Sequence, residues 1–310
     1  MIKISVADLA SRYREAPLVR HALRAVARAT CKGYVYVATT GHSGTTSLTE
    51  MFRGDPRCCG THHTSVPMNG WAVSAYEHGE LGVLREHLVR HKLPQVFRHA
   101  AGHRWYVETN HLFMKSFASL MPEFLGDRLK VIRLRRDPLL VATSLVTRGP
   151  IPGVNADGFR WLGDYRAPSV RLPMADVLDG DPRFAHGFYK AVWHTYEIEA
   201  RYREFRRDHP EVTCVEIGTT ELNDREAIKR LVRELGMGEA HPGMLDRVGT
   251  RANVGRKKRV IPAEAVSAAA FVDLCEARLV EVSGDLSVGQ RHLIDYDNLT
   301  VGPASMAVAA

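Results

Sequence analysis

The hydrophobic positions of the chain follow two spacings, one typical of buried strands and one typical of amphipathic helices. Short runs rich in β-branched and aromatic residues predict strands at 34–37, at 129–134, at 212–217 and at the start of 105–113. Apolar residues at helical spacing predict helices at 5–29 (offset by Pro17), 45–53, 71–92, 111–124, 184–208, 223–235 and 262–282. Strands that alternate with helices predict an α/β protein.

A turn rich in Gly, Ser and Thr joins the first strand to the helix at 45–53. This order gathers backbone N–H groups and the positive end of a helix around one point, which favours binding of a phosphate. Gly41 and Gly44 permit positive φ and let an anion approach without meeting a Cβ atom. Hydroxyl donors are added by Ser43, Thr45, Thr46 and Ser47. In the alternative interpretation, Ser43 or Thr45 only caps the helix.

A second candidate for phosphate binding is the stretch 129–145, LKVIRLRRDPLLVATSL. Arg136 follows the strand, and Asp137-Pro138 predicts the start of a helix. Ser144 lies eight residues after Arg136, about two helical turns further on. A guanidinium and a hydroxyl in these positions can hold a phosphate. The alternative is a surface cluster in which Arg136 and Asp137 only flank the helix start.

GHSGTTSL and RLRRDPLLVATSL, in this order and roughly 90 residues apart, resemble two motifs of the sulfotransferases that use 3′-phosphoadenosine-5′-phosphosulfate (PAPS). Trp193, the strand VTCVEI and the segment LVRELGM resemble a later part of that family, so the resemblance spans about residues 33–260. It implies PAPS as the donor and adenosine 3′,5′-bisphosphate as the product. The residues implied to bind the donor are Thr40, Gly41, His42, Ser43, Gly44, Thr45, Thr46, Ser47, Arg136 and Ser144.

A basic loop at 249–259 loosely resembles the family's C-terminal loop that closes over the 3′-phosphate. The resemblance places Arg251, Lys257 and Lys258 on that phosphate. A solvated basic run is the alternative interpretation.

The resemblance also implies the fold: a three-layer, doubly wound, mainly parallel sheet with a P-loop-like strand-loop-helix. We expect a single domain over 1–310, with an N-terminal helical extension at 1–30 and a C-terminal tail at 285–310. The stretch 149–183 is rich in Gly, Pro, Asp and aromatic residues and predicts a lid on the acceptor side. A variable surface insertion is the alternative.

Candidates for the general base follow the predicted strands. His62 and His63 come soon after the phosphate loop, and an imidazole with a near-neutral pKa can take a proton from a hydroxyl. Glu108 is the other candidate, with Asn110 or His111 orienting it or binding substrate; a structural carboxylate is its alternative role. His42 stands where the family usually has Lys or Arg, and we expect it to stabilise the bridging oxygen while it is protonated.

Composition narrows the possible partners. A formal net charge of +7 and a pI of about 9.2 favour anionic ligands, and Lys and Arg are spread without a nucleic-acid motif. Five cysteines at irregular spacing argue against a disulfide framework. The segment CCGTHH lacks the second ligand pair typical of structural zinc, so we expect no metal. With no predicted membrane span, we expect a soluble, cytoplasmic protein; no repeat or heptad indicates an oligomeric state.

The sequence therefore predicts a PAPS-dependent sulfotransferase. The predicted acceptor is a hydroxyl or an amine of a small molecule or a glycan; it attacks sulfur in line, and a His or Glu acts as the base that removes its proton. One alternative is a kinase-like P-loop phosphotransferase, disfavoured because GxxxxGK[ST] and a metal-binding Asp after a strand are missing. Another is a non-catalytic nucleotide-binding protein.

Overall fold

A computed structural model of the chain describes residues 17–250, 260–284, 290–294 and 300–301. Its centre is a five-stranded sheet with the order β2-β3-β1-β4-β5, in which every pair of neighbouring strands is parallel. The strands are β1 (Gly33–Ala38), β2 (Cys58–Thr61), β3 (Trp105–Glu108), β4 (Leu129–Arg135) and β5 (Thr213–Gly218). A separate pair of short parallel strands is formed by β6 (Val260–Ile261) and β7 (Thr300–Val301). The predicted α/β class with a parallel sheet is confirmed.

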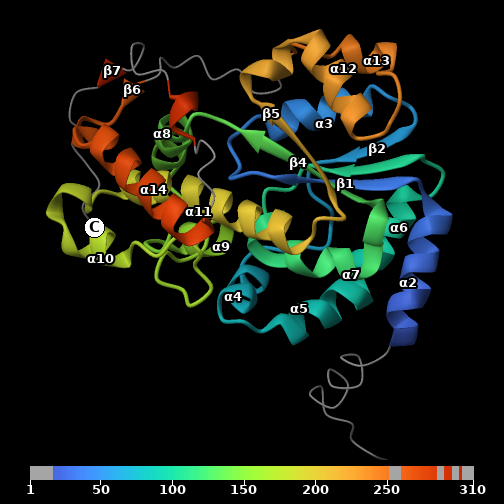
Figure 1. The fold of residues 1–310 in the computed structure, drawn as a ribbon, viewed down its shortest axis with the longest axis horizontal. Helices are drawn as coiled ribbons and strands as arrows, with labels where there is room; N and C mark the ends of the chain where they lie inside the picture. The colour runs from blue at the N-terminus through green and yellow to red at the C-terminus, as the bar shows by residue number, and fades with distance from the viewer. Residues whose placement is uncertain (1–16, 251–259, 285–289, 295–299, 302–310) are drawn as a thin grey trace, which may run out of the picture.

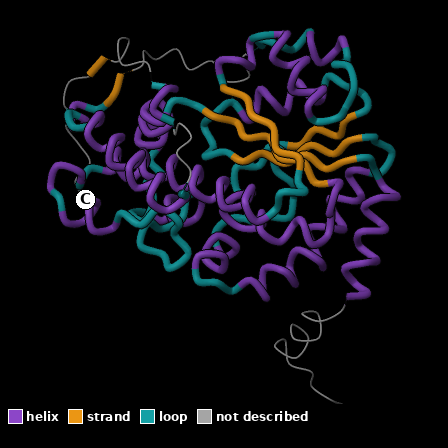
Figure 2. The backbone as a smooth tube through the Cα atoms, in the orientation of Figure 1, coloured by secondary structure: helices purple, strands orange, loops and turns teal. Residues whose placement is uncertain are grey.

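Helices cover both faces of the sheet, and a third group packs beside it (Figures 1 and 2). One face carries α3 (Thr45–Arg53), α12 (Arg225–Glu234) and α13 (Pro242–Leu245). The other face carries α2 (Pro17–Thr30), α4 (Trp71–Glu77), α5 (Leu81–His87), α6 (Leu93–Ala100) and α7 (Met121–Leu125). The group beside the sheet contains α8 (Pro138–Arg148), α9 (Ala156–Trp161), α10 (Ala175–Gly180), α11 (Gly187–Asp208) and α14 (Ala268–Ser283). The three layers of the predicted doubly wound fold are present.

Strand β1 shows why the sheet lies between two helical layers. Its side chains point alternately to opposite faces, as in any strand. Tyr34 and Tyr36 pack into the core beneath α4 to α7, whereas Val35 and Val37 pack into the core beneath α3 and α12. All four are fully buried. A strand that is apolar on both faces must be covered on both, so β1 holds the centre of the sheet.

Three sequence predictions need correction. The helix predicted over 71–92 is broken, because Gly79 with a φ of 75° separates α4 from α5, and helical structure then continues to Ala100. The helix predicted over 111–124 is a succession of short pieces, beginning with a π-helical turn at Phe113–Phe117. Strand β2 was not predicted, because the polar and small residues of CCGTHH hide its pattern.

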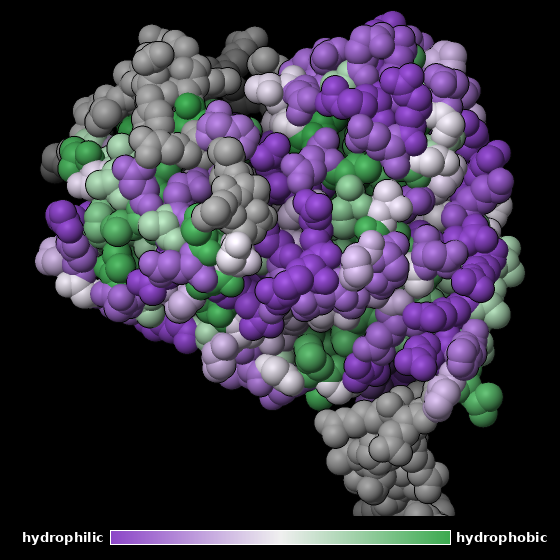
Figure 3. Space-filling model, in the orientation of Figure 1, coloured by the Kyte–Doolittle hydropathy of each residue, from purple (hydrophilic) through white to green (hydrophobic). Residues whose placement is uncertain are grey.

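The stretch 149–183 is folded and contains two short helices, α9 and α10. Tyr165, Leu172 and Leu178 are buried in the core that α8 and α11 share. The loop-like composition of 149–183 therefore did not reveal that the segment is helical in part and packed into the core. Its role as a lid stays a prediction. Hydrophilic side chains dominate the surface over α12 and α13 (Figure 3).

Some predictions fall outside the described residues. Arg251, Lys257 and Lys258 lie there, as do the helical pattern before Pro17 and most of the tail at 285–310. In the part of the chain that is described, none of the helices has both the length and the apolar character that crossing a membrane requires.

Candidate active site

The site lies where the five parallel strands end, because all their carboxyl ends meet at one edge of the sheet. The segments that follow the strands carry the predicted functional residues. Those predicted from sequence are the loop residues 40–44 after β1, His62 and His63 after β2, His111 after β3 and Arg136 after β4. Thr109 after β3 and Thr219 after β5 were not predicted, and they lie at the same edge. Residues spread over about 180 positions are thus brought to one edge by strand direction alone.

The loop after β1 has a backbone that only some residues adopt. Gly41, His42 and Gly44 have φ values of 86°, 54° and 88°, and His42 is the one non-glycine residue with positive φ in the described part of the chain. A Cβ atom on Gly41 would lie 3.2 Å from Cγ of His111, and one on Gly44 would lie 3.0 Å from Leu222. The two glycines are therefore required both by conformation and by close packing, as the sequence predicted.

The first turn of α3 lacks a side-chain cap. Gly44 stands at the N-cap position, no side chain caps the helix, and its first turn has no acidic residue. Ser43 and Thr40 instead donate hydrogen bonds to the Gly41 carbonyl, at 2.9 and 2.8 Å. Capping by Ser43, the alternative interpretation, is not what the structure shows. The backbone N–H groups at the start of α3 and the positive end of its dipole are suited to an anion.

Arg136 and Ser144 converge on this loop. The guanidinium Nη1 of Arg136 donates to the carbonyl oxygen of His42. Ser144, from α8, lies with its Oγ 3.0 Å from Nδ1 of the same histidine. Asp137 caps α8 by accepting from the backbone N–H groups of Leu139 and Leu140, at 2.8 and 3.2 Å. The two predicted motifs are therefore one contiguous site.

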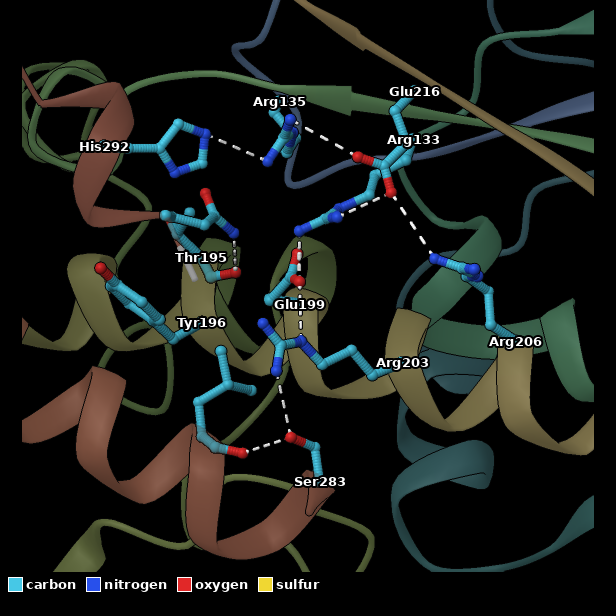
Figure 4. Close-up of polar contacts among 12 residues, drawn as sticks. Arg133, Arg135, Thr195, Tyr196, Glu199, Arg203, Arg206, Glu216, Ser283 and His292 are labelled. Carbon is cyan, nitrogen blue, oxygen red and sulfur yellow. Dashed lines mark hydrogen bonds and ion pairs between the residues drawn. The ribbon is translucent and has the colours of Figure 1, made fainter. Parts of the chain in front are cut away.

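Arg133 and Arg135, which precede Arg136 in the motif, form ion pairs with glutamates. Arg133 pairs with Glu199 and, at 2.9 Å, with Glu216, while Arg135 lies 3.4 Å from Glu216 (Figure 4). These ion pairs tie β4 to β5 and α11. Of the three arginines in RLRRDP, Arg136 is the one that contacts the loop.

The neighbours of His42 are cationic. Burial, followed by Arg148, Lys115 and Arg136, lowers the pKa of His42 to about 4. The imidazole is therefore neutral at pH 7 in the unliganded protein. A bound anion must first raise that pKa before His42 can act as the protonated group that the sequence predicted.

Three histidine rings and one tryptophan ring form a cluster next to the loop that follows β1, where His111 packs against Gly41. The His63 ring lies 4.4 Å from the His62 ring and 5.6 Å from the His111 ring, and Trp161 of α9 lies 6.0 Å from His111. His62 Nδ1 is 3.0 Å from the hydroxyl of Thr109. Burial lowers the pKa of His62 to about 4 and also lowers the pKa of His63. Neutral imidazoles of this kind can accept protons.

Glu108 lies beneath these rings in a buried ion pair. Its Oε1 accepts from Lys92 at 2.6 Å and from Asn110 at 3.1 Å, and its Oε2 accepts from Tyr106 at 2.8 Å. The side chains of Glu108 and Lys92 are both fully buried. This is the arrangement of a structural carboxylate, and a role for Glu108 as a base stays a prediction.

Sequence reasoning did not single out Lys115. Lys115 lies with its Nζ 2.8 Å from Nδ1 of His111, four residues earlier in the chain. The signal was a lysine inside the apolar stripe Phe113 to Phe117, and that stripe is itself buried as predicted. Trp161 belongs to the aromatic residues of the predicted lid at 149–183, and its position beside the histidine rings was not predicted.

A cavity of about 460 Å³ lies between α4 and α9. Glu77 from α4 and Phe159 and Arg160 from α9 contribute to its lining. Burial raises the pKa of Glu77 to about 7, and its Oε1 accepts from the backbone N–H of Asp164 at 2.6 Å. Trp161, next to Arg160 in α9, borders the histidine rings.

The segment CCGTHH forms β2 and the start of the following loop. Within the described ranges, His, Cys, Asp and Glu side chains form no group of three or more that could hold a metal ion.

No family model and no curated protein matches this chain. Several solved structures are similar to it. Sulfotransferase STF9 from Mycobacterium avium is 12% identical, with a TM-score of 0.46 over 88% of this chain and 83% of that chain. A sulfotransferase from Alicyclobacillus acidocaldarius is 15% identical, with a TM-score of 0.45 over 83% and 98% of the two chains. The sulfotransferase domain of the Synechococcus PCC 7002 olefin synthase is 13% identical, with a TM-score of 0.42 over 84% and 96%. Likeness at this level carries no conclusion about chemistry, so we infer function from the site.

Proposed function

We propose that this chain is a sulfotransferase that moves the sulfuryl group of PAPS to a hydroxyl or an amine of a small-molecule or glycan acceptor. The observation that carries the proposal is the convergence of Arg136 and Ser144 on the loop that precedes the uncapped start of α3. An anionic ligand at this point would meet the N-terminal backbone N–H groups of α3, a guanidinium and hydroxyls. The residues match both halves of the sequence resemblance.

In this proposal the loop residues 40–47 hold the 5′-phosphosulfate, and Arg136 with Ser144 holds the 3′-phosphate. Binding releases the contacts of Arg136 and Ser144 with His42. The anion then offsets the cationic neighbours that lower the pKa of His42. His42 takes up a proton as the donor binds and stabilises the charge that develops on the leaving 5′-phosphate.

The base in this proposal is His111. Its ring packs against Gly41 of the loop, and its Nδ1 is held by Lys115, so its position relative to the donor is fixed. His63 is more exposed, and His62 already contacts Thr109. Glu108 has its oxygens occupied by three buried donors. His111 therefore fits a base better than the three residues predicted from sequence.

The cavity between α4 and α9 is the proposed acceptor site. Its volume of about 460 Å³ is in the range of small-molecule pockets. Phe159 offers an apolar contact and Arg160 a cation, and Trp161 of the same helix touches the catalytic rings. A small acceptor that bears a ring therefore fits better than a long glycan.

Calorimetric titration with adenosine 3′,5′-bisphosphate tests the donor, with ADP and ATP as competitors. We expect the bisphosphate to bind most tightly and Arg136→Ala to weaken it by about tenfold to a hundredfold, the loss of one charge-assisted contact. Arg128→Ala is the matched control, because Arg128 lies at the opposite end of β4. Preference for ATP, or equal effects of the two substitutions, would contradict the proposal.

The same titration at pH 7.5 and pH 6 tests His42. Because the pKa of His42 is low before binding and higher after it, proton uptake should favour binding at the lower pH. His42→Gln should lose this part of the pH dependence and leave only the part due to the ligand's own phosphates. Identical pH dependence in both proteins would exclude the role of His42.

A further inference from the structure

Lys115 is buried without a carboxylate partner. Its side chain is 1% exposed, and it takes part in none of the ion pairs within the described residues. Its one hydrogen-bond partner there is Nδ1 of His111, at 2.8 Å. A buried ammonium that lacks a counter-charge is costly, and a lysine in such a place usually becomes neutral instead.

The contact between Lys115 and His111 has two possible directions. An ammonium can only donate, which requires a bare Nδ1 and places the ring proton on Nε2. A free amine can accept, so that Nδ1 carries the proton and Nε2 keeps its lone pair. The contact therefore decides whether the outer nitrogen of His111 is a donor or a base.

The surroundings favour the free amine. Burial and the Arg201 guanidinium lower the pKa of Lys115 well below its usual range, and the Glu77 carboxyl opposes them as a lesser effect. Burial also lowers the pKa of His111 well below its usual range, and His63, His194 and His42 act in the same direction. Of the groups named here, only the Glu77 carboxyl favours an added proton.

We propose that Lys115 is a positioning residue which, as a free amine, accepts the Nδ1 proton of His111 and leaves Nε2 open as the base for the acceptor. This inference rests on the proposed function. The acceptor oxygen forms its bond to sulfur while the bond from sulfur to the 5′-phosphate oxygen breaks. The acceptor proton moves to Nε2, and the Nδ1 proton can then move to Nζ of Lys115, so charge and protons balance.

Measuring which ring nitrogen of His111 carries the proton tests the role of Lys115, and the measurement needs no acceptor substrate. Fifteen histidines are present, so the His111 signals are assigned as those that His111→Gln removes from the nitrogen-15 spectrum of histidine-labelled protein. At pH 7.5 we expect wild-type His111 to be protonated on Nδ1, with Nε2 bare. As the pH falls and Lys115 takes up a proton, the ring proton should move to Nε2 or the ring should become doubly protonated.

Lys115→Met keeps the length of the side chain and removes the amine. We expect His111 in this variant to shift mainly to the Nε2-protonated form. Lys115→Arg should do the same, since a guanidinium can only donate. Lys130→Met is the matched control, because Lys130 is a half-buried lysine whose pKa is also lowered, and its contact is the Thr213 hydroxyl at 3.3 Å. It should leave the His111 tautomer unchanged.

Wild-type His111 protonated on Nε2 at pH 7.5 would overturn the inference, whether or not the variants fold. An unchanged tautomer in Lys115→Met would overturn it as well. Adenosine 3′,5′-bisphosphate separates this inference from the proposed function. Binding of the bisphosphate with the wrong tautomer rejects only the role of Lys115, whereas the expected tautomer without binding rejects only the sulfotransferase.

Discussion

Two lysines buried beside the same strand end have opposite surroundings. Lys92 meets the carboxylate of Glu108 at 2.6 Å, and Thr64 accepts a second hydrogen bond from it at 2.6 Å. Lys115 meets only an imidazole, that of His111 at 2.8 Å. The side chain of Lys92 is fully buried and that of Lys115 is 1% exposed. Burial is therefore the same, and the partner alone differs.

The difference separates a structural charge from a reactive one. In the pair Lys92–Glu108 each charge satisfies the other, so neither is available for proton transfer at the surface of the cleft. Lys115 has no such partner, and its protonation is free to respond to the ring that it contacts. A buried lysine is thus informative about function when its carboxylate is missing.

Of the substitutions that test the contrast between Lys92 and Lys115, Lys92→Met has the largest expected effect. The substitution leaves Glu108 buried without its cation, which costs about 3–5 kcal/mol of the free energy of unfolding. Urea unfolding followed by circular dichroism at pH 7 measures it. The double variant Lys92→Met/Glu108→Met should recover much of the loss, since it removes both charges. A single variant as stable as wild type would mean that the pair is not the structural one.

Glu77 provides a second test of the contrast between the two lysines. Its carboxyl raises the pKa of Lys115 but forms no ion pair with it within the described residues. Burial raises its pKa to about 7 from an ordinary 4.5. The native state therefore holds a proton that the unfolded state loses, and wild-type stability falls as the pH rises from about 4.5 to 7. Glu77→Gln keeps an oxygen for the Asp164 N–H group and avoids this loss.

The expected result for Glu77→Gln is a gain over wild type that is small at pH 5 and about 3 kcal/mol larger at pH 8. Urea midpoints at both values measure it. Asp157→Asn on the exposed part of α9 is the control and should show no such change. A difference that does not depend on pH would show that Glu77 is ionised in the native protein.

The sequence was sufficient for four of the five strands of the sheet and for the glycine turn after β1. Strands at β1 and β4 are continuous apolar runs, and the turn between β1 and α3 uses glycines where positive φ occurs. Arg136 and Ser144 were found because their spacing spans a strand end and two turns of a helix. These features are local, and local patterns specify local structure.

The remainder of the site is not local. Lys115 and His111 are neighbours in the chain, but whether Lys115 has a carboxylate depends on what α4 and α11 place around it. Glu108 was predicted as a base, and its partner Lys92, sixteen residues earlier in the chain, was not foreseen. Trp161 reaches the rings only because 149–183 folds into helices. Partners of this kind follow from packing, which periodicity does not encode.

Lys115→Met gives the smallest expected effect, and its sign opposes that of Lys92→Met. The pKa of Lys115 is lower in the native state than in the unfolded state, where it is near 10.5. Between these two values the unfolded chain binds more protons, so wild-type stability rises with pH by at most about 1.4 kcal/mol per pH unit from this group. Lys115→Met removes that rise, and it also removes a buried group that is costly when charged.

The Lys115→Met variant should therefore be as stable as wild type or more stable at pH 7, and should lose this advantage by pH 9.5 in urea unfolding. A loss of several kcal/mol at pH 7, like that of Lys92→Met, would mean that Lys115 is a paired structural cation, and the contrast between the two lysines would be wrong.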